Sequence, residues 1–270
     1  MTPASTARTE RPAGSAWAFL PFALGAAALA AQAISTTAAI ATGLLFFAIG
    51  IAHGAADEQD GAISRFGLLP AAAYIVSGLA VMTLFLAVPL AGLTMFLALS
   101  AWHFARSTEG TWLKGMAFAG IATGGSMLFQ FDRTRGVFAA LTGAAIPEGW
   151  LYIWVVTGAL GVAGAVLHLC REPEDHSMWI AVLAVVLLHP VLAVGVLFLV
   201  GHAIPVQTKQ VQTYGSGVVV SAQTPATIAA LAGAGALVLL WRFDLVPLTV
   251  LAAAAFGFTT PHMLSERLEL

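Results

Sequence analysis

Long apolar runs, separated by short charged or proline- and glycine-rich breaks, follow one another along almost the whole chain after residue 15. About 20 consecutive apolar residues are enough for a helix to cross the hydrocarbon core of a bilayer. The breaks between the runs mark the helix ends. The pattern predicts ten helices, near residues 16–34, 36–53, 67–87, 89–106, 113–131, 149–170, 177–188, 190–207, 225–241 and 245–264.

The apolar stretch 177–206 is too long for one crossing and short for two. Pro190 lacks a backbone donor and clashes with the preceding turn, so we expect two short helices that meet at His189 and Pro190. A single long, kinked helix is the alternative. Together the runs predict an all-α integral membrane protein, a polytopic bundle of about eight to ten transmembrane helices.

The chain divides into a polar N-terminal tail, residues 1–15, and a single transmembrane helical domain, residues 16–270. The run after the tail is longer than the core of a signal peptide, which predicts a retained first helix. With the N-terminus in the cytoplasm, most Lys and Arg residues fall on the cytoplasmic side, as the positive-inside rule requires. We therefore expect a protein of the bacterial inner membrane, surrounded by lipid, with a cytoplasmic N-terminus.

Composition supports this view and excludes other classes. The chain is 59% hydrophobic and 9% charged, with a mean hydropathy of +0.90, whereas soluble domains carry about 25% charged residues. A net charge of -2 with 11 scattered basic residues excludes a nucleic-acid partner. Cys170 is the single cysteine, so an intramolecular disulfide is excluded and a metal would be held by histidine or carboxylate.

Glycines spread through the apolar runs are expected to allow close approach of neighbouring helices. The candidates for such packing are Gly120, Gly124, Gly125, Gly161, Gly164, Gly233 and Gly235.

Histidine is the informative residue type, because an ionisable side chain inside a membrane helix is costly and usually functional. In the predicted topology His53, His103, His202 and His262 all lie late in helices that run from outside to inside. They therefore share one depth in the cytoplasmic half of the membrane. Four imidazoles at one level, without thiolate or carboxylate, predict a site for ferrous iron or copper.

Further residues can support such a site. His168 shares the same depth and can be a fifth ligand, a neighbour of the ligands or an interfacial residue. Asp57 can accept the free ring N–H of a ligand histidine, and Trp102 can line an apolar cavity. We expect His176 to be exposed in a charged loop and His189 to lie on the opposite side, so that neither is a ligand.

Three motifs carry a resemblance to a known family. Residues 53–57 read HGAAD, residues 100–104 read SAWHF and residues 260–264 read TPHML. In order and spacing they resemble the Brp/Blh family of membrane-embedded β-carotene 15,15'-dioxygenases, and the region from His189 to His202 is similar to that family's fourth motif region. The resemblance spans about residues 45–265.

The resemblance implies an all-helical membrane enzyme that uses non-haem Fe²⁺ and O₂ to split the central double bond of β-carotene into two retinals. It implies His53, His103 and His202 as iron ligands, with His262 as a further ligand or close neighbour. The product would supply a retinal-using rhodopsin or a pigment–protein complex. One motif departs from the pattern: where the family reads Trp-His-Ser-x-Arg-His, residues 201–206 read GHAIPV, so the second histidine is replaced by Val206.

The departure leaves several functions open. The first is oxidative cleavage of a carotenoid, completed by His262 or His168. The second is a noncatalytic carotenoid- or pigment-binding membrane subunit that has lost part of the metal motif. A membrane b-type cytochrome would use paired histidines on haem. A transporter is a further alternative, although the internal repeats typical of transporters are missing from the sequence.

Overall fold

The computed structural model describes residues 16–51 and 68–265, and within these ranges it contains helices and no strands. The expected all-α fold is therefore confirmed. The first half of the chain forms α1 (Ala16–Ile34), α2 (Thr36–Ile51), α3 (Leu68–Ala87), α4 (Pro89–Ser107), α5 (Trp112–Gly120), the π-helix η2 (Ile121–Gly125), α6 (Ser126–Phe129) and α7 (Phe131–Thr142). The tail 1–15 lies outside the described residues.

The second half forms α8 (Glu148–Leu169), α9 (His176–Leu187), α10 (Pro190–Val196), the π-helix η3 (Leu197–Ala203), α11 (Ile204–Tyr214), α12 (Ser216–Arg242) and α13 (Leu248–Ser265). The predicted division at His189 and Pro190 is confirmed: α9 ends at Leu187, and Pro190 opens α10. Proline suits this first position because the N–H that it lacks would have no partner in the helix.

The predicted helix over 113–131 is only partly right. It stops at Phe129, because Gln130 leaves the helical conformation, and α7 follows as a separate, unpredicted helix. Its charged residues, including Asp132, lower the hydropathy of the segment below that of the apolar runs. Its buried face is nevertheless helical in spacing, with Thr134, Phe138 and Thr142 four residues apart.

Two further boundaries are corrected. The helices expected at 190–207 and 225–241 extend toward each other, to Tyr214 and from Ser216, and meet at Gly215 with a φ of 85°. Polar side chains lower the hydropathy there. They satisfy each other across the two helices: Gln207 Nε2 donates to Gln223 Oε1 at 2.8 Å, and Gln223 Nε2 donates to Gln210 Oε1 at 3.4 Å.

Glycines bring α5 and η2 against α8. A Cβ on Gly124 would stand 2.3 Å from the backbone nitrogen of Gly158, and one on Gly120 would stand 2.7 Å from Cα of Gly161. The two backbones therefore touch, as small residues permit in membrane helices. The expectation of packing is wrong for Gly233 and Gly235, where an added Cβ would meet nothing within 4 Å.

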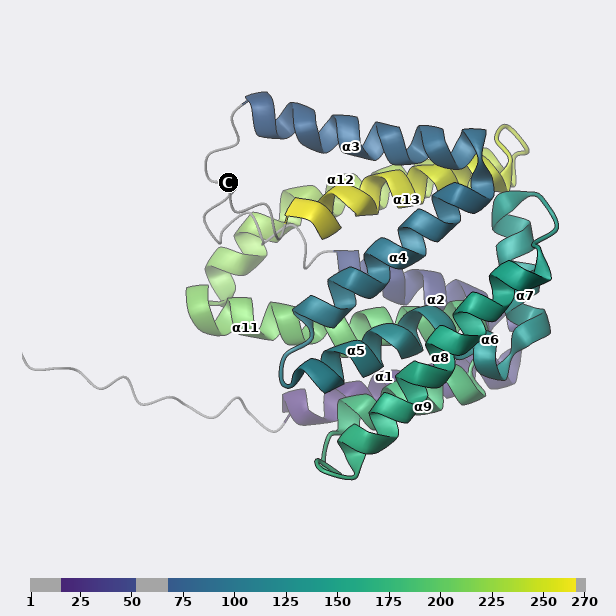
Figure 1. Cartoon of the computed structure of the whole chain (residues 1–270). Coiled ribbons are helices and arrows are strands. Elements are labelled where there is room, and N and C mark those ends of the chain that lie inside the picture. The colour runs from purple at the N-terminus through teal and green to yellow at the C-terminus, as the bar shows by residue number, and fades with distance from the viewer. Residues whose placement is uncertain (1–15, 52–67, 266–270) are drawn as a thin grey trace, which may run out of the picture.

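The helices form a layered bundle in which α4 crosses between two groups (Figure 1). On one side α3 and α13 run along each other, with α12 beside α13. On the other side α5, η2 and α8 pack together, and α10 packs on α2. Helix α4 contacts both α3 and α5, so a residue on α4 can meet side chains from either group.

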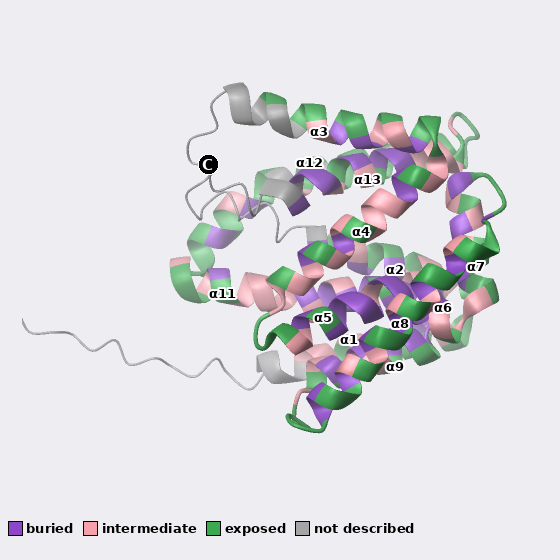
Figure 2. Cartoon of the chain, in the orientation of Figure 1, coloured by how far each residue is buried: buried purple, intermediate pink, exposed green. Residues whose placement is uncertain are grey.

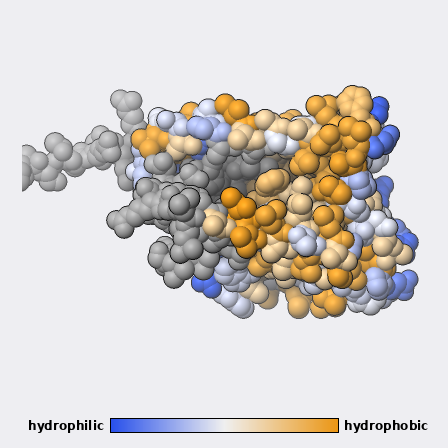
Figure 3. Space-filling view, turned by 90° about the horizontal axis from the view of Figure 1, so that it is seen from above, coloured by the Kyte–Doolittle hydropathy of each residue, from blue (hydrophilic) through white to orange (hydrophobic). Residues whose placement is uncertain are grey.

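The surface is that of a membrane protein. Three helices, Glu148–Leu169, Pro190–Tyr214 and Ser216–Arg242, are long and apolar enough to cross a bilayer, and shorter apolar helices accompany them. The 22 residues of α8 span about 33 Å, close to the thickness of the hydrocarbon core. Outward faces of the helices remain exposed although they are apolar (Figures 2 and 3). In Figure 3 hydrophilic side chains gather along the right-hand edge of an apolar surface.

Candidate metal centre

Two buried histidines from distant parts of the chain meet inside the bundle. His103 of α4 and His202 of η3 are 4% and 2% exposed, and their Nε2 atoms lie 3.0 Å apart. The rings meet edge to face, with centroids 4.7 Å apart. Of the four histidines expected at one depth, the structure thus brings these two together.

The local sequence explains how His202 reaches this position. Pro205 would clash with the carbonyl four residues earlier in a regular α-helix, and it cannot donate to that carbonyl. The chain instead widens into η3, and the N–H of Ile204 bonds to the carbonyl of Leu199, five residues back. A π-helical segment rotates the residues that follow it, and such segments frequently occur at functional sites. Here His202 lies within the segment and is turned inward.

His103 lies on the buried face of α4. The buried residues of that helix are Gly92, Leu93, Ser100 and His103, spaced as one helical face. Ser107, one turn after His103, donates its hydroxyl proton to the carbonyl of His103 at 2.8 Å, and its Oγ lies 3.3 Å from Nδ1 of His202. The end of α4 therefore touches both nitrogens of the His202 ring.

Aromatic rings enclose the pair. Phe104 meets the His202 ring edge to face at 5.3 Å, and Phe198 lies 5.9 Å from it on the other helix. Phe118 in turn packs edge to face against Phe104 at 5.7 Å. Apolar surroundings exclude water and strengthen the electrostatic interactions of whatever binds between the histidines.

Glycine at position 201 admits one of these rings. A Cβ on Gly201 would stand 2.4 Å from the ring of Phe118. The Phe118 ring, from α5, thus fills the space beside His202 that a larger residue at 201 would occupy. Val206, in contrast, offers no donor atom in place of the histidine expected there by resemblance.

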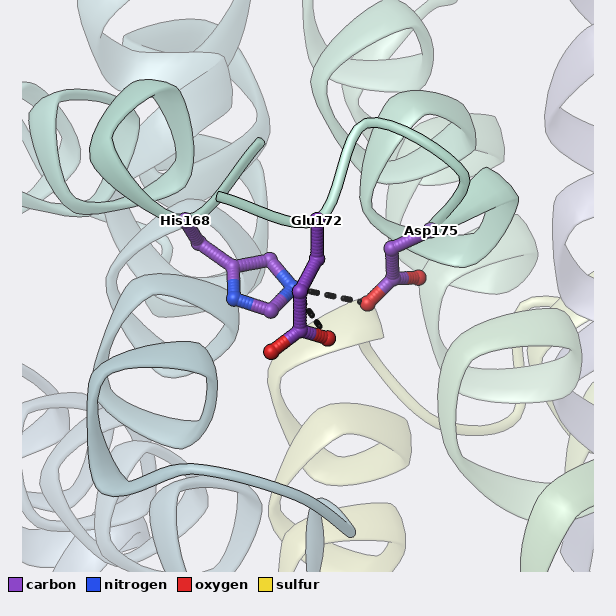
Figure 4. Close-up of side chains that lie close together, drawn as sticks. All are labelled: His168, Glu172 and Asp175. Atoms are coloured by element: carbon purple, nitrogen blue, oxygen red, sulfur yellow. Dashed lines mark hydrogen bonds and ion pairs between the residues drawn. The ribbon is translucent and has the colours of Figure 1, made fainter. Parts of the chain in front are cut away.

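Another buried histidine, His168, belongs to a different kind of cluster (Figure 4). His168, at the end of α8, is 2% exposed, and its Nε2 lies 2.8 Å from Oδ2 of Asp175 and 3.9 Å from Oε2 of Glu172. Lys114 of α5 completes the cluster, with Nζ 2.7 Å from the same Asp175 oxygen. The hydrogen bonds and ion pairs of His168 within the described residues are thus to carboxylates, not to His103 or His202.

The Asp175 carboxylate is already fully engaged. It caps α9 by accepting from the N–H of Met178, and it accepts from the hydroxyl of Ser177. Burial raises the pKa of Asp175, but the Lys114 ammonium and the hydrogen bonds outweigh it and hold this pKa well below its usual range. Although His168, Glu172 and Asp175 could be read as metal ligands, a cation there would have to displace the ammonium of Lys114.

The His103–His202 pair fits a metal better. Two imidazole nitrogens bound at about 2.1 Å to adjacent positions of an octahedral ion, with about 90° between the bonds, lie about 3.0 Å apart. The observed Nε2 separation has this value. A buried imidazole donor set of this kind suits ferrous iron.

The remaining expected residues are placed only in part. His53 and Asp57 lie outside the described residues, as does the side chain of His262. The neighbour of His262, Met263, accepts a hydrogen bond from Ser100 on the buried face of α4, at 3.9 Å. Trp102 is 38% exposed, with the Arg106 guanidinium 5.8 Å from its ring.

The structure also places His176 and His189, for which no ligand role was expected. His176 is exposed and contacts the ring of Phe22. His189 is buried and caps α10, with Nδ1 accepting from the N–H of Val191. Sequence reasoning missed Ser107 and Phe118. The four-residue spacing from His103 could have indicated Ser107, but no signal in the sequence points to Phe118.

Fold and site together define an all-helical membrane protein with a buried, metal-capable imidazole pair. A family model described as beta-carotene 15,15'-dioxygenase matches residues 44–268 of the chain. The chain therefore belongs to this family, and the resemblance seen in its motifs is confirmed. Searches of curated proteins and of solved structures gave no match.

Proposed function

We propose that this protein cleaves a carotenoid oxidatively, β-carotene to retinal by family, with non-haem Fe²⁺ and O₂ inside the membrane. His103 and His202 would hold the iron, together with His53 and His262. The observation that carries the proposal is the 3.0 Å approach of two buried Nε2 atoms in a chain of the beta-carotene dioxygenase family. Bound iron would supply the activation of O₂.

The residues around the pair have roles that follow from their contacts. Phe104 and Phe198 flank the His202 ring and keep water from it. A polyene is apolar throughout, so an apolar lining can position it by packing alone. No general base is needed for this chemistry, and none is assigned. The supporting roles of Asp57 and Trp102 stay predictions, whereas the contacts of His168 with Asp175 and Glu172 support a structural role.

The membrane setting matches the substrate class. A carotenoid is dissolved in the hydrocarbon core, and much of the outer surface of the bundle is apolar. Substrate can therefore reach the protein from the lipid. A location in the bacterial inner membrane, a cytoplasmic N-terminus and a rhodopsin or pigment–protein complex that uses the product stay predictions from the sequence.

Expression in bacteria that accumulate β-carotene tests the proposal. Retinal in the chromatographed extract of cells with the wild-type chain, and its absence with His103→Ala, is the expected result. His176→Ala is the matched control, because His176 is exposed and is not one of the proposed iron ligands. Intact carotenoid in all cultures, despite folded protein, would contradict cleavage of β-carotene. Carotenoid that co-purifies without being cut would instead favour a noncatalytic pigment-binding subunit. The observation on the side of that alternative is that Val206 stands where the family motif has its second histidine.

A further inference from the structure

Ser107 makes two contacts that together restrict the state of His202. It is the last residue of α4, and its Oγ lies 2.8 Å from the carbonyl oxygen of His103 and 3.3 Å from Nδ1 of His202. One hydroxyl thus joins the backbone of one histidine to the ring of the other.

The direction of these hydrogen bonds follows from donor chemistry. A carbonyl oxygen can only accept, so the single hydroxyl proton of Ser107 points to His103. The Oγ lone pairs then face Nδ1 of His202, which must be the donor of the second bond. A neutral imidazole has one N–H, so its Nε2 carries the lone pair. That nitrogen is the one turned toward His103, 3.0 Å away.

We propose that Ser107 is a positioning residue: it holds His202 in the Nδ1–H tautomer and directs the Nε2 lone pair to the point between the two histidines. The part of this inference that concerns a metal rests on the proposed function, whereas the tautomer does not. Metal-binding histidines commonly have their other ring nitrogen hydrogen-bonded in this way, which fixes the ring and its basicity.

A neighbouring residue provides a matched control. Thr108 donates its hydroxyl proton to the carbonyl of Phe104 at 2.7 Å, the same bond one residue further along. No histidine among the residues that the structure describes is bonded to it. Thr108→Ala therefore removes an equivalent hydroxyl from the end of α4 without touching His202, and Ser107→Thr keeps the hydroxyl in place.

The first experiment measures the tautomer in metal-free, full-length protein labelled with ¹⁵N-histidine. Ring-nitrogen shifts are recorded at about pH 8, above the ordinary pKa of histidine, and His202→Gln identifies the signals of His202. We expect Nδ1 protonated and Nε2 unprotonated in the wild type and in Thr108→Ala, and a mixture or the other tautomer in Ser107→Ala. An Nε2–H tautomer in the wild type, or no change in Ser107→Ala, would overturn the assignment.

The second experiment measures Fe²⁺ binding by the same proteins without O₂. Ser107→Ala should bind about 10- to 100-fold more weakly, while Ser107→Thr and Thr108→Ala stay near the wild type. Ser107→Cys, which keeps the side-chain size, replaces Ser107→Ala should that variant not fold. Equal affinity in every variant overturns the role toward iron. If even the wild type binds no Fe²⁺ but the tautomer result holds, the proposed function fails and the positioning by Ser107 stands.

Discussion

His202 and His168 are both buried to 2% exposure, and each ring has a partner atom within 3.0 Å, yet their surroundings have opposite chemistry. His168 faces Asp175, which also holds the Lys114 ammonium. His202 faces a second imidazole, a serine hydroxyl and aromatic rings. Burial and proximity alone therefore do not distinguish a metal-capable histidine from a structural one.

What distinguishes them is the kind of partner that each ring contacts. In the His168 cluster the Asp175 carboxylate is paired with the Lys114 ammonium and hydrogen-bonded to His168. These contacts join α5, α8 and the start of α9. At His202 the Nε2 atoms of two imidazoles face each other, and the hydroxyl of Ser107 lies at Nδ1 of His202. Two facing imidazole nitrogens are a donor set for a divalent cation, whereas a cation at the His168 cluster would have to displace the Lys114 ammonium.

The largest expected difference between the two regions is in bound iron. His202→Ala removes one of two facing donors, so the affinity for Fe²⁺ should fall by at least about 100-fold, more than the loss of the supporting Ser107 costs. His168→Ala should keep its iron and lose thermal stability instead. Iron per chain, measured on folded protein of both variants, checks this. Loss of bound iron in His168→Ala but not in His202→Ala would reverse the assignment of the two sites.

The packing beside His202 gives the next largest effect. Gly201→Ala would place a Cβ 2.4 Å from the Phe118 ring and push that ring against Phe104. We expect a loss of stability of about 1–3 kcal/mol, with a lowered rate of cleavage. Adding Phe118→Leu should restore part of both, whereas Gly149→Ala, where a Cβ meets nothing within 4 Å, should be neutral. Independent, additive effects of the two changes would show that the ring is not the obstacle.

Sequence reasoning predicted much of this arrangement, because membrane helices are read from hydropathy and histidine is rare in them. The apolar runs located most of the helices, and the shared depth of His103 and His202 anticipated their meeting. The break at Pro190 was also foreseen, since proline acts locally.

The rest depends on contacts that no periodicity reports. The sequence did not predict α7, because its charged residues lower its hydropathy although one narrow face is buried. It also did not predict the full length of α11 and α12, because their polar glutamines lower the hydropathy and are hydrogen-bonded to each other across the two helices. His168 was expected at the same depth as the pair, but its ring is bonded to Asp175, seven residues along the chain. Depth alone cannot show which neighbour a side chain will meet.

A smaller effect is expected from opening the His168 cluster. Asp175→Asn removes the partner of both Lys114 and His168, and we expect a loss of about 2 kcal/mol, seen as a lower melting temperature in detergent. Lys114→Met should cost less, because Asp175 keeps its hydrogen bonds from His168 and Ser177. Cleavage of carotenoid per folded molecule should be unchanged in both. A loss of bound iron in Asp175→Asn would connect the two regions and contradict their separation.

The smallest effect is the pH dependence of the difference in melting temperature between the wild type and Asp175→Asn. The pKa of Asp175 is lowered in the folded protein, so its contribution to stability is fully present above the unfolded pKa of about 3.9 and is lost as the pH falls toward the folded value. The gap in melting temperature between the wild type and Asp175→Asn should therefore stay constant between about pH 8 and pH 5, and narrow only below about pH 4. A gap that closes between pH 7 and pH 5 would mean that a group with a higher pKa, rather than the Asp175 carboxylate, controls the cluster.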